Sequence, residues 1–259
     1  MTTQAPQSTV VSGRAPATVL WLADGGRRAL VTVVLPLLAA AVLAWVLTAR
    51  TSDTMMGATS FLSAWTVMMA AMMLPAAAPV VALYALASRR GVVAAVPVFV
   101  AGYLCVWAAT GAPAYLVSRA VSDPLMDGQA WVGRVVGATL LTAAAYQLTP
   151  LKDACLTRCR SPLSFYLTRT GSLSVPRRAF AAGAQHGLYC LGCCWALMAV
   201  LVVLGGMQLG WALALALALS AEKLLPGRRQ VSRLVAAAGA GLGLTLLAAP
   251  STLAHLIHM

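Results

Sequence analysis

Charged side chains are scarce in this sequence, and acidic ones are scarcer still. Only 9% of the 259 residues are charged, whereas soluble proteins usually carry about 25%. Hydrophobic residues make up 61% of the chain, which is more apolar surface than a soluble core can bury. The composition therefore predicts an integral membrane protein with several transmembrane helices.

Several catalytic motifs are also missing. The six acidic residues form no paired carboxylate site, and the chain has no Ser, His and Asp set and no phosphate-binding glycine loop. Hydrolysis and ATP-driven transport therefore have no support, and a function other than catalysis is favoured. A transporter of this kind would be passive, ion-coupled or driven by another subunit.

The basic residues outnumber the acidic ones and give a net charge of +12. They lie between the apolar runs rather than along one face, which is typical of membrane loops and argues against nucleic-acid binding. If the N-terminus is inside, 15 of the 18 Lys and Arg residues lie on the inner side, and the others are Arg50, Arg119 and Arg134. The positive-inside rule therefore predicts a cytoplasmic N-terminus and an external C-terminus.

Seven apolar runs have roughly the 20 residues that a transmembrane helix needs. They cover residues 29–49, 61–87, 92–118, 131–149, 188–204, 207–225 and 232–254. We therefore expect an all-α transmembrane bundle of about seven helices, forming a single domain over residues 29–259. Residues 1–28 have no secretory cleavage site and are expected to be a partly disordered cytoplasmic tail. Residues 150–186 would form a cytoplasmic loop that contains cysteines.

Soft-metal ligands are concentrated near the fifth of these runs, in the stretches HGLYCLGCCWALM and KDACLTRCRSP. The side chains concerned are Cys155, Cys159, His186, Cys190, Cys193 and Cys194. In a helix, the last four share one face within an arc of about 100°. His186 and Cys194 would be roughly 12 Å apart along the axis, so that one ion cannot bind all four. Two or three of them could bind an ion together with Cys155 and Cys159.

Thiolate and imidazole favour Zn²⁺ or Cu(I). We expect this cluster to lie at a helix N-terminus beside arginines, and both features would lower the pKa of its thiols. On the cytoplasmic side the thiols would stay reduced, without structural disulfides. Metal binding is favoured, but reversible thiol chemistry and simple packing of small cysteines stay open as alternatives.

The stretch WTVMMAAMMLPAAAPVV contains two i,i+4 pairs of methionines near mid-membrane, formed by Met68, Met69, Met72 and Met73. Thioethers suit Cu(I) and hardly suit Zn²⁺, so copper is the first choice of metal and zinc the second. The alternative is that this stripe is ordinary core packing. The sequence leaves open whether a further outer group belongs to the same site, namely Met55, Met56, His255 and His258.

Glu222 is the only glutamate in the chain and is followed by Lys223 near the inner end of the sixth run. Acids inside a membrane are often functional. Here we favour an interfacial pair that reaches water along flexible stems.

Four stretches occur in an order that resembles a known family: WTVMMAAMMLPAAAPVV, YQLTPLKDACLTRCRSPLSF, GAQHGLYCLGCCWALM and EKLLPG. The chain resembles the bacterial predicted metal-binding integral membrane proteins grouped as domain of unknown function 2182, over roughly residues 60–230. The resemblance implies a multi-helix membrane protein with a metal site on Cys, His and Met residues. Met207 and Gln208 stand where the family would have a Met-Asn pair, so Gln208 is a small departure.

We therefore expect a multi-pass protein of the bacterial inner membrane that binds copper or zinc for transport or delivery. The lipid bilayer and the metal ion are its expected partners, and any protein partners stay open. One rival hypothesis is a thiol oxidoreductase that exchanges electrons with a quinone. The other is a non-catalytic assembly factor of a membrane complex.

Overall fold

The computed structural model describes residues 30–51, 57–87, 92–127, 129–160, 175–205, 208–225 and 227–252. Every regular element in these residues is helical. In chain order the elements are η1 (Leu30–Val34), α2 (Leu35–Thr51), α3 (Ala58–Ala87), α4 (Val92–Ala109), α5 (Gly111–Met126), α6 (Ala130–Gln147), α7 (Pro150–Arg160), α9 (Pro176–Val203), α10 (Leu209–Leu224), α11 (Arg228–Ala248) and η2 (Pro250–Thr252). The predicted all-α fold is thus confirmed.

Two of the predictions fall outside the described residues. The first is the cytoplasmic tail of residues 1–28. The second is the outer ligand group of Met55, Met56, His255 and His258.

Five helical segments are long and apolar enough to cross a membrane. They are Val31–Arg50, Ala58–Leu86, Ala95–Leu125, Pro176–Val203 and Arg229–Ala248. The expected number of seven is not reached within the described residues, because α6 and α10 are not in this set. The expected span 92–118 is also two helices, α4 and α5, which meet at Thr110.

The expected loop at 150–186 contains helix at both ends. Pro150 and Pro176 begin α7 and α9, at the position where a missing backbone N–H costs nothing. Thr149 caps α7, since its hydroxyl accepts a hydrogen bond from the backbone N–H of Lys152 at 3.3 Å. Because α7 is polar, the sequence has no apolar run there from which a helix would be predicted.

Helices α4 and α9 cross at two glycines. A Cβ atom on Gly183 would overlap the carbonyl of Phe99, and one on Gly102 would overlap the carbonyl of Phe180. Small residues let helix backbones approach closely within a membrane. This crossing places Tyr103, one turn beyond Phe99, beside the cysteine-bearing face of α9.

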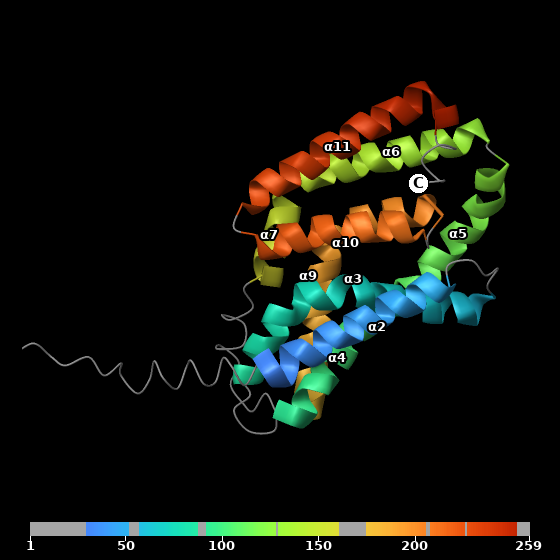
Figure 1. Cartoon of the computed structure of the whole chain (residues 1–259). Helices are drawn as coiled ribbons and strands as arrows, with labels where there is room; N and C mark the ends of the chain where they lie inside the picture. The colour runs from blue at the N-terminus through green and yellow to red at the C-terminus, as the bar shows by residue number, and fades with distance from the viewer. Residues whose placement is uncertain are drawn as a thin grey trace, which may run out of the picture.

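Helices α6 and α11 form a second close pair, which runs along one edge of the bundle in Figure 1. A Cβ on Gly137 would lie 2.8 Å from the carbonyl oxygen of Gly243, and the reverse distance is 2.9 Å. Helix α10 packs against α3 on one side and α11 on the other (Figure 1). Because α10 also contacts α7 and α9, several helices converge on it.

We predict that Gly183→Val separates α4 from α9 and destabilises the protein by roughly 1–3 kcal/mol, the usual cost of overpacking. The measurement is thermal unfolding in detergent. Gly241→Val is the matched control, because a Cβ at this helical glycine meets nothing within 4 Å. Equal unfolding temperatures for the two variants would show that the crossing does not depend on Gly183.

Candidate metal site

The four predicted ligands of α9 lie on one buried face, as their spacing indicates. His186, Cys190, Cys193 and Cys194 are at most 3% exposed. Cys190, however, lies near the middle of the 28-residue α9 rather than at its start. The expectation of a helix N-terminus at this cluster was therefore wrong, since the dipole effect is confined to the first turn.

The sulfur of Cys190 is the point on which other side chains converge. Lys223 on α10 donates a hydrogen bond from Nζ to this sulfur at 3.0 Å. The hydroxyl of Tyr103 on α4 lies 3.1 Å from the same sulfur. The Cys159 thiol on α7 is also within hydrogen-bonding range. A sulfur surrounded by a cation, a phenol and a thiol is placed to carry negative charge.

Cys193 and Cys194 make local contacts. Both thiols donate to the backbone carbonyl of Cys190, at 3.0 and 2.9 Å, in the i−3 and i−4 manner of small polar side chains in helices. All six cysteines of the chain are free. The expectation that these thiols stay reduced in the cytoplasm remains a prediction.

The two cysteines of α7 have different surroundings. Hydrogen bonds with Cys190 and Cys193, together with burial, raise the pKa of Cys159 well above its usual value. Cys155 is half-buried against Gly192, and burial raises the pKa of its thiol. Arg158 lowers the pKa of Cys155, as expected, but burial outweighs this effect, and both α7 thiols have a raised pKa. Only Cys159 contacts Cys190.

His186 is 3% exposed, and neither of its ring nitrogens has a hydrogen-bond partner in the described part of the chain. Its ring stacks on Tyr103, with 5.5 Å between the centroids. A neutral imidazole has one donor and one acceptor, and both are costly to leave unpaired in a buried place. His186 thus has the free nitrogen that a metal ligand needs.

The four predicted methionines of α3, Met68, Met69, Met72 and Met73, are all completely or almost completely buried. The sulfur of Met73 lies 3.5 Å from Nζ of Lys223, the same atom that contacts Cys190. The structure therefore brings Met73 to the cysteine cluster. Met68, Met69 and Met72 belong to the packed interior around α3.

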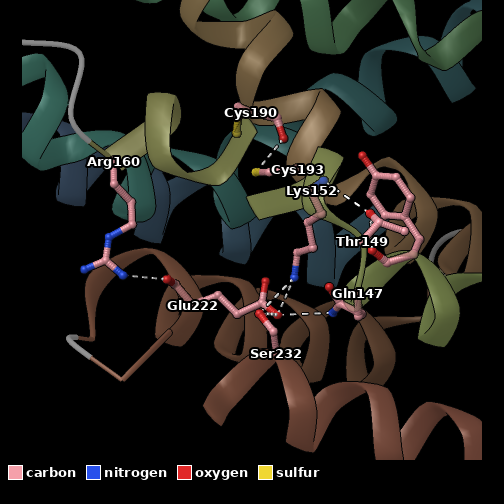
Figure 2. Close-up of polar contacts among 9 residues, drawn as sticks. Gln147, Thr149, Lys152, Arg160, Cys190, Cys193, Glu222 and Ser232 are labelled. Atoms are coloured by element: carbon pink, nitrogen blue, oxygen red, sulfur yellow. Dashed lines mark hydrogen bonds and ion pairs between the residues drawn. The ribbon is translucent and has the colours of Figure 1, made fainter. Parts of the chain in front are cut away.

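Glu222 does not reach water, contrary to our preferred interpretation. It is 1% exposed and pairs with Lys152 of α7, with 2.7 Å between Oε1 and Nζ. Ser232 of α11 and Gln147 of α6 both donate to the same oxygen at 3.1 Å. Figure 2 shows these side chains converging below Cys190. Burial of the acid is possible because every neighbour donates to it.

Arg160 fixes the end of α10. Its guanidinium donates to the backbone carbonyl of Glu222 at 2.9 Å (Figure 2). It also donates to the backbone carbonyl of Leu225 at 2.7 Å. A basic side chain here satisfies carbonyls that lack a helical partner and complements the helix dipole. Lys152 and Arg160 of α7 thus both hold the turn of α10 that carries Lys223.

The model of the PpoB2 copper-chaperone family matches residues 62–246. The chain belongs to this copper-chaperone family. The match runs from within α3 into α11 and so includes every residue of the site described above. It supports the predicted link to a metal-binding family. No curated protein and no solved structure matches the chain.

The donor atoms fit the metal of a copper-chaperone family, because Cu(I) prefers thiolate and thioether sulfur. Cys159, Cys190 and Met73 bring such sulfurs together, and His186 has unpartnered nitrogens beside them. In the described residues, no group of three or more His, Cys, Asp or Glu side chains could hold a metal ion as it stands.

The sequence did not lead us to place Lys152, Lys223 or Tyr103 in the candidate site, although Lys223 was noted beside Glu222. One signal could have indicated the lysines, since the chain has only these two and otherwise uses arginine. Lysine presents a compact charge, whereas arginine presents a wide planar group, so they are not interchangeable in a small buried site. Tyr103 has no signal in the sequence, because its role depends on the crossing of α4 and α9.

We predict that Lys152→Met alone destabilises the protein by about 3–5 kcal/mol, because it leaves the Glu222 carboxylate buried without its partner. The double variant Lys152→Met/Glu222→Gln should recover most of the loss. The amide oxygen still accepts from Ser232, and no charge is left unpaired. Thermal unfolding in detergent measures both effects. If the double variant is as unstable as the single one, the loss is due to packing and not to charge.

Proposed function

We propose that this protein binds Cu(I) within the helical bundle through sulfur ligands centred on Cys190, and delivers the ion to copper-requiring partners. The main support is the position of two sulfur atoms. The Cys190 sulfur and the Met73 thioether face a common point, at which the structure has the Lys223 ammonium. Cys159 and the unpartnered His186 supply further ligands at this place.

Copper is preferred to zinc for two reasons. A thioether is a poor ligand for Zn²⁺ and a good one for Cu(I). Membership of a copper-chaperone family supports the same choice.

Location in the bacterial inner membrane is part of the proposal. Five described helices are long and apolar enough to cross a membrane. The loops richest in Lys and Arg lie in the cytoplasm by the positive-inside rule. The end of α10 that carries Glu222 and Lys223 would therefore face the cytoplasm. The remaining methionines of α3, Met68, Met69 and Met72, would then be a relay for soft ions from the opposite side.

We predict that wild-type protein, purified anaerobically in detergent and loaded with Cu(I), retains close to one copper per chain. Cys190→Ser and Met73→Leu should each lose most of the copper, because each removes a soft ligand. Mass spectrometry of metal content gives the measurement. Cys105→Ser is the matched control, since Cys105 is a free and exposed cysteine on α4, and it should retain its copper.

Full copper retention by Cys190→Ser would contradict this assignment. Wild-type protein that binds no metal but forms a Cys190–Cys193 disulfide on mild oxidation would favour the thiol oxidoreductase instead. Zinc retained in place of copper would move the proposal to the second metal.

A further inference from the structure

Lys223 is a buried cation without a carboxylate partner. It is 6% exposed, and no ion pair joins it to an acid within the part of the chain that the structure describes. Glu222, its neighbour, is already paired with Lys152. A buried ammonium is strongly unfavourable unless acceptors surround it. The acceptors that Lys223 has are the sulfurs of Cys190 and Met73.

The position of Nζ is that of a bound monovalent cation. It lies 3.0 Å from the Cys190 sulfur and 3.5 Å from the Met73 sulfur. A cysteine sulfur and a thioether sulfur are the types of ligand that Cu(I) prefers. The ammonium and Cu(I) also carry the same single charge, so that one can replace the other without changing the charge of the buried site. They cannot occupy it together.

We infer that Lys223 is a built-in placeholder for the copper ion: its ammonium occupies the metal position between Cys190 and Met73, leaves when Cu(I) enters, and returns when Cu(I) departs. This inference rests on the proposed function and adds the means by which the site is kept ready and emptied. The tethered cation competes with the ion, and this competition is what a chaperone needs in order to release its cargo.

The surroundings of Lys223 suit such a movement. It is the penultimate residue of α10, and the next residues, Leu224 and Leu225, are exposed. The side chain can therefore turn towards the helix end without unwinding the helix. The backbone of this turn is meanwhile held by Arg160 and by the pair of Glu222 with Lys152.

Chemical labelling tests the movement directly, because Lys152 and Lys223 are the only lysines in the chain. Full-length protein in detergent is treated with an amine-acylating reagent, with and without Cu(I), and its peptides are analysed by mass spectrometry. We expect both lysines to be protected in the metal-free protein. Copper should expose Lys223 and leave Lys152, the internal control, protected. Protection of Lys223 in protein that holds one copper per chain would overturn the placeholder.

Copper content is measured on the same samples, so that the two proposals fail in different ways. Bound copper with Lys223 still protected rejects the placeholder alone. Wild-type protein that binds no copper rejects the proposed function, and the placeholder with it. Lys223 that reacts equally in both states also overturns the placeholder.

A second measurement follows the release of copper. Transfer of Cu(I) from the protein to a colourimetric chelator should be slower in Lys223→Leu than in wild type by about tenfold or more, because the competing cation is gone. Lys223→Arg keeps a cation and should stay closer to wild type. Transfer at the wild-type rate in a folded Lys223→Leu variant would contradict the inference. If that variant does not fold, the labelling of the wild-type protein still decides.

Discussion

The cost of burying a positive charge governs this structure. Both lysines of the chain are almost fully enclosed by helices, and each must find an acceptor there. Lys152 has the only glutamate, and Lys223 has the sulfurs of Cys190 and Met73. Glu222 and Lys223, which are adjacent in α10, therefore have different roles. Glu222 forms the ion pair that joins α10 to α7, whereas Lys223 provides the cation that, in our proposal, Cu(I) replaces.

The helix packing explains why these groups meet. The glycine crossing of α4 and α9 lets Tyr103 reach Cys190 and lets its ring cover His186. Helix α7, capped by Thr149, packs against α9 and α10 and brings Cys159 to the cluster. No ligand is thus placed by local sequence alone. Family membership points to copper, and this packing brings the sulfurs of Cys159, Cys190 and Met73 near one another.

Periodicity was enough to predict the helical fold and the shared buried face of His186, Cys190, Cys193 and Cys194, because both follow from local spacing. The start of α9 and the presence of α7 were missed, since polar helices lack apolar runs. Cys155 and Cys159 are four residues apart, as Cys190 and Cys194 are. Only Cys159 contacts Cys190, and this depends on how α7 packs against α9. The placement of Lys223 likewise depends on α10 packing between α3 and α11, which sequence spacing does not contain.

A copper site centred on Cys190 is tested most directly by X-ray absorption at the copper edge. Cu(I)-loaded wild-type protein is compared with the Cys190→Ser variant loaded in the same way. We expect a first shell dominated by sulfur in the wild type, and loss of sulfur scattering when Cys190 is replaced. A first shell of nitrogen and oxygen only, or a sulfur shell unchanged in Cys190→Ser, would contradict a copper site centred on Cys190.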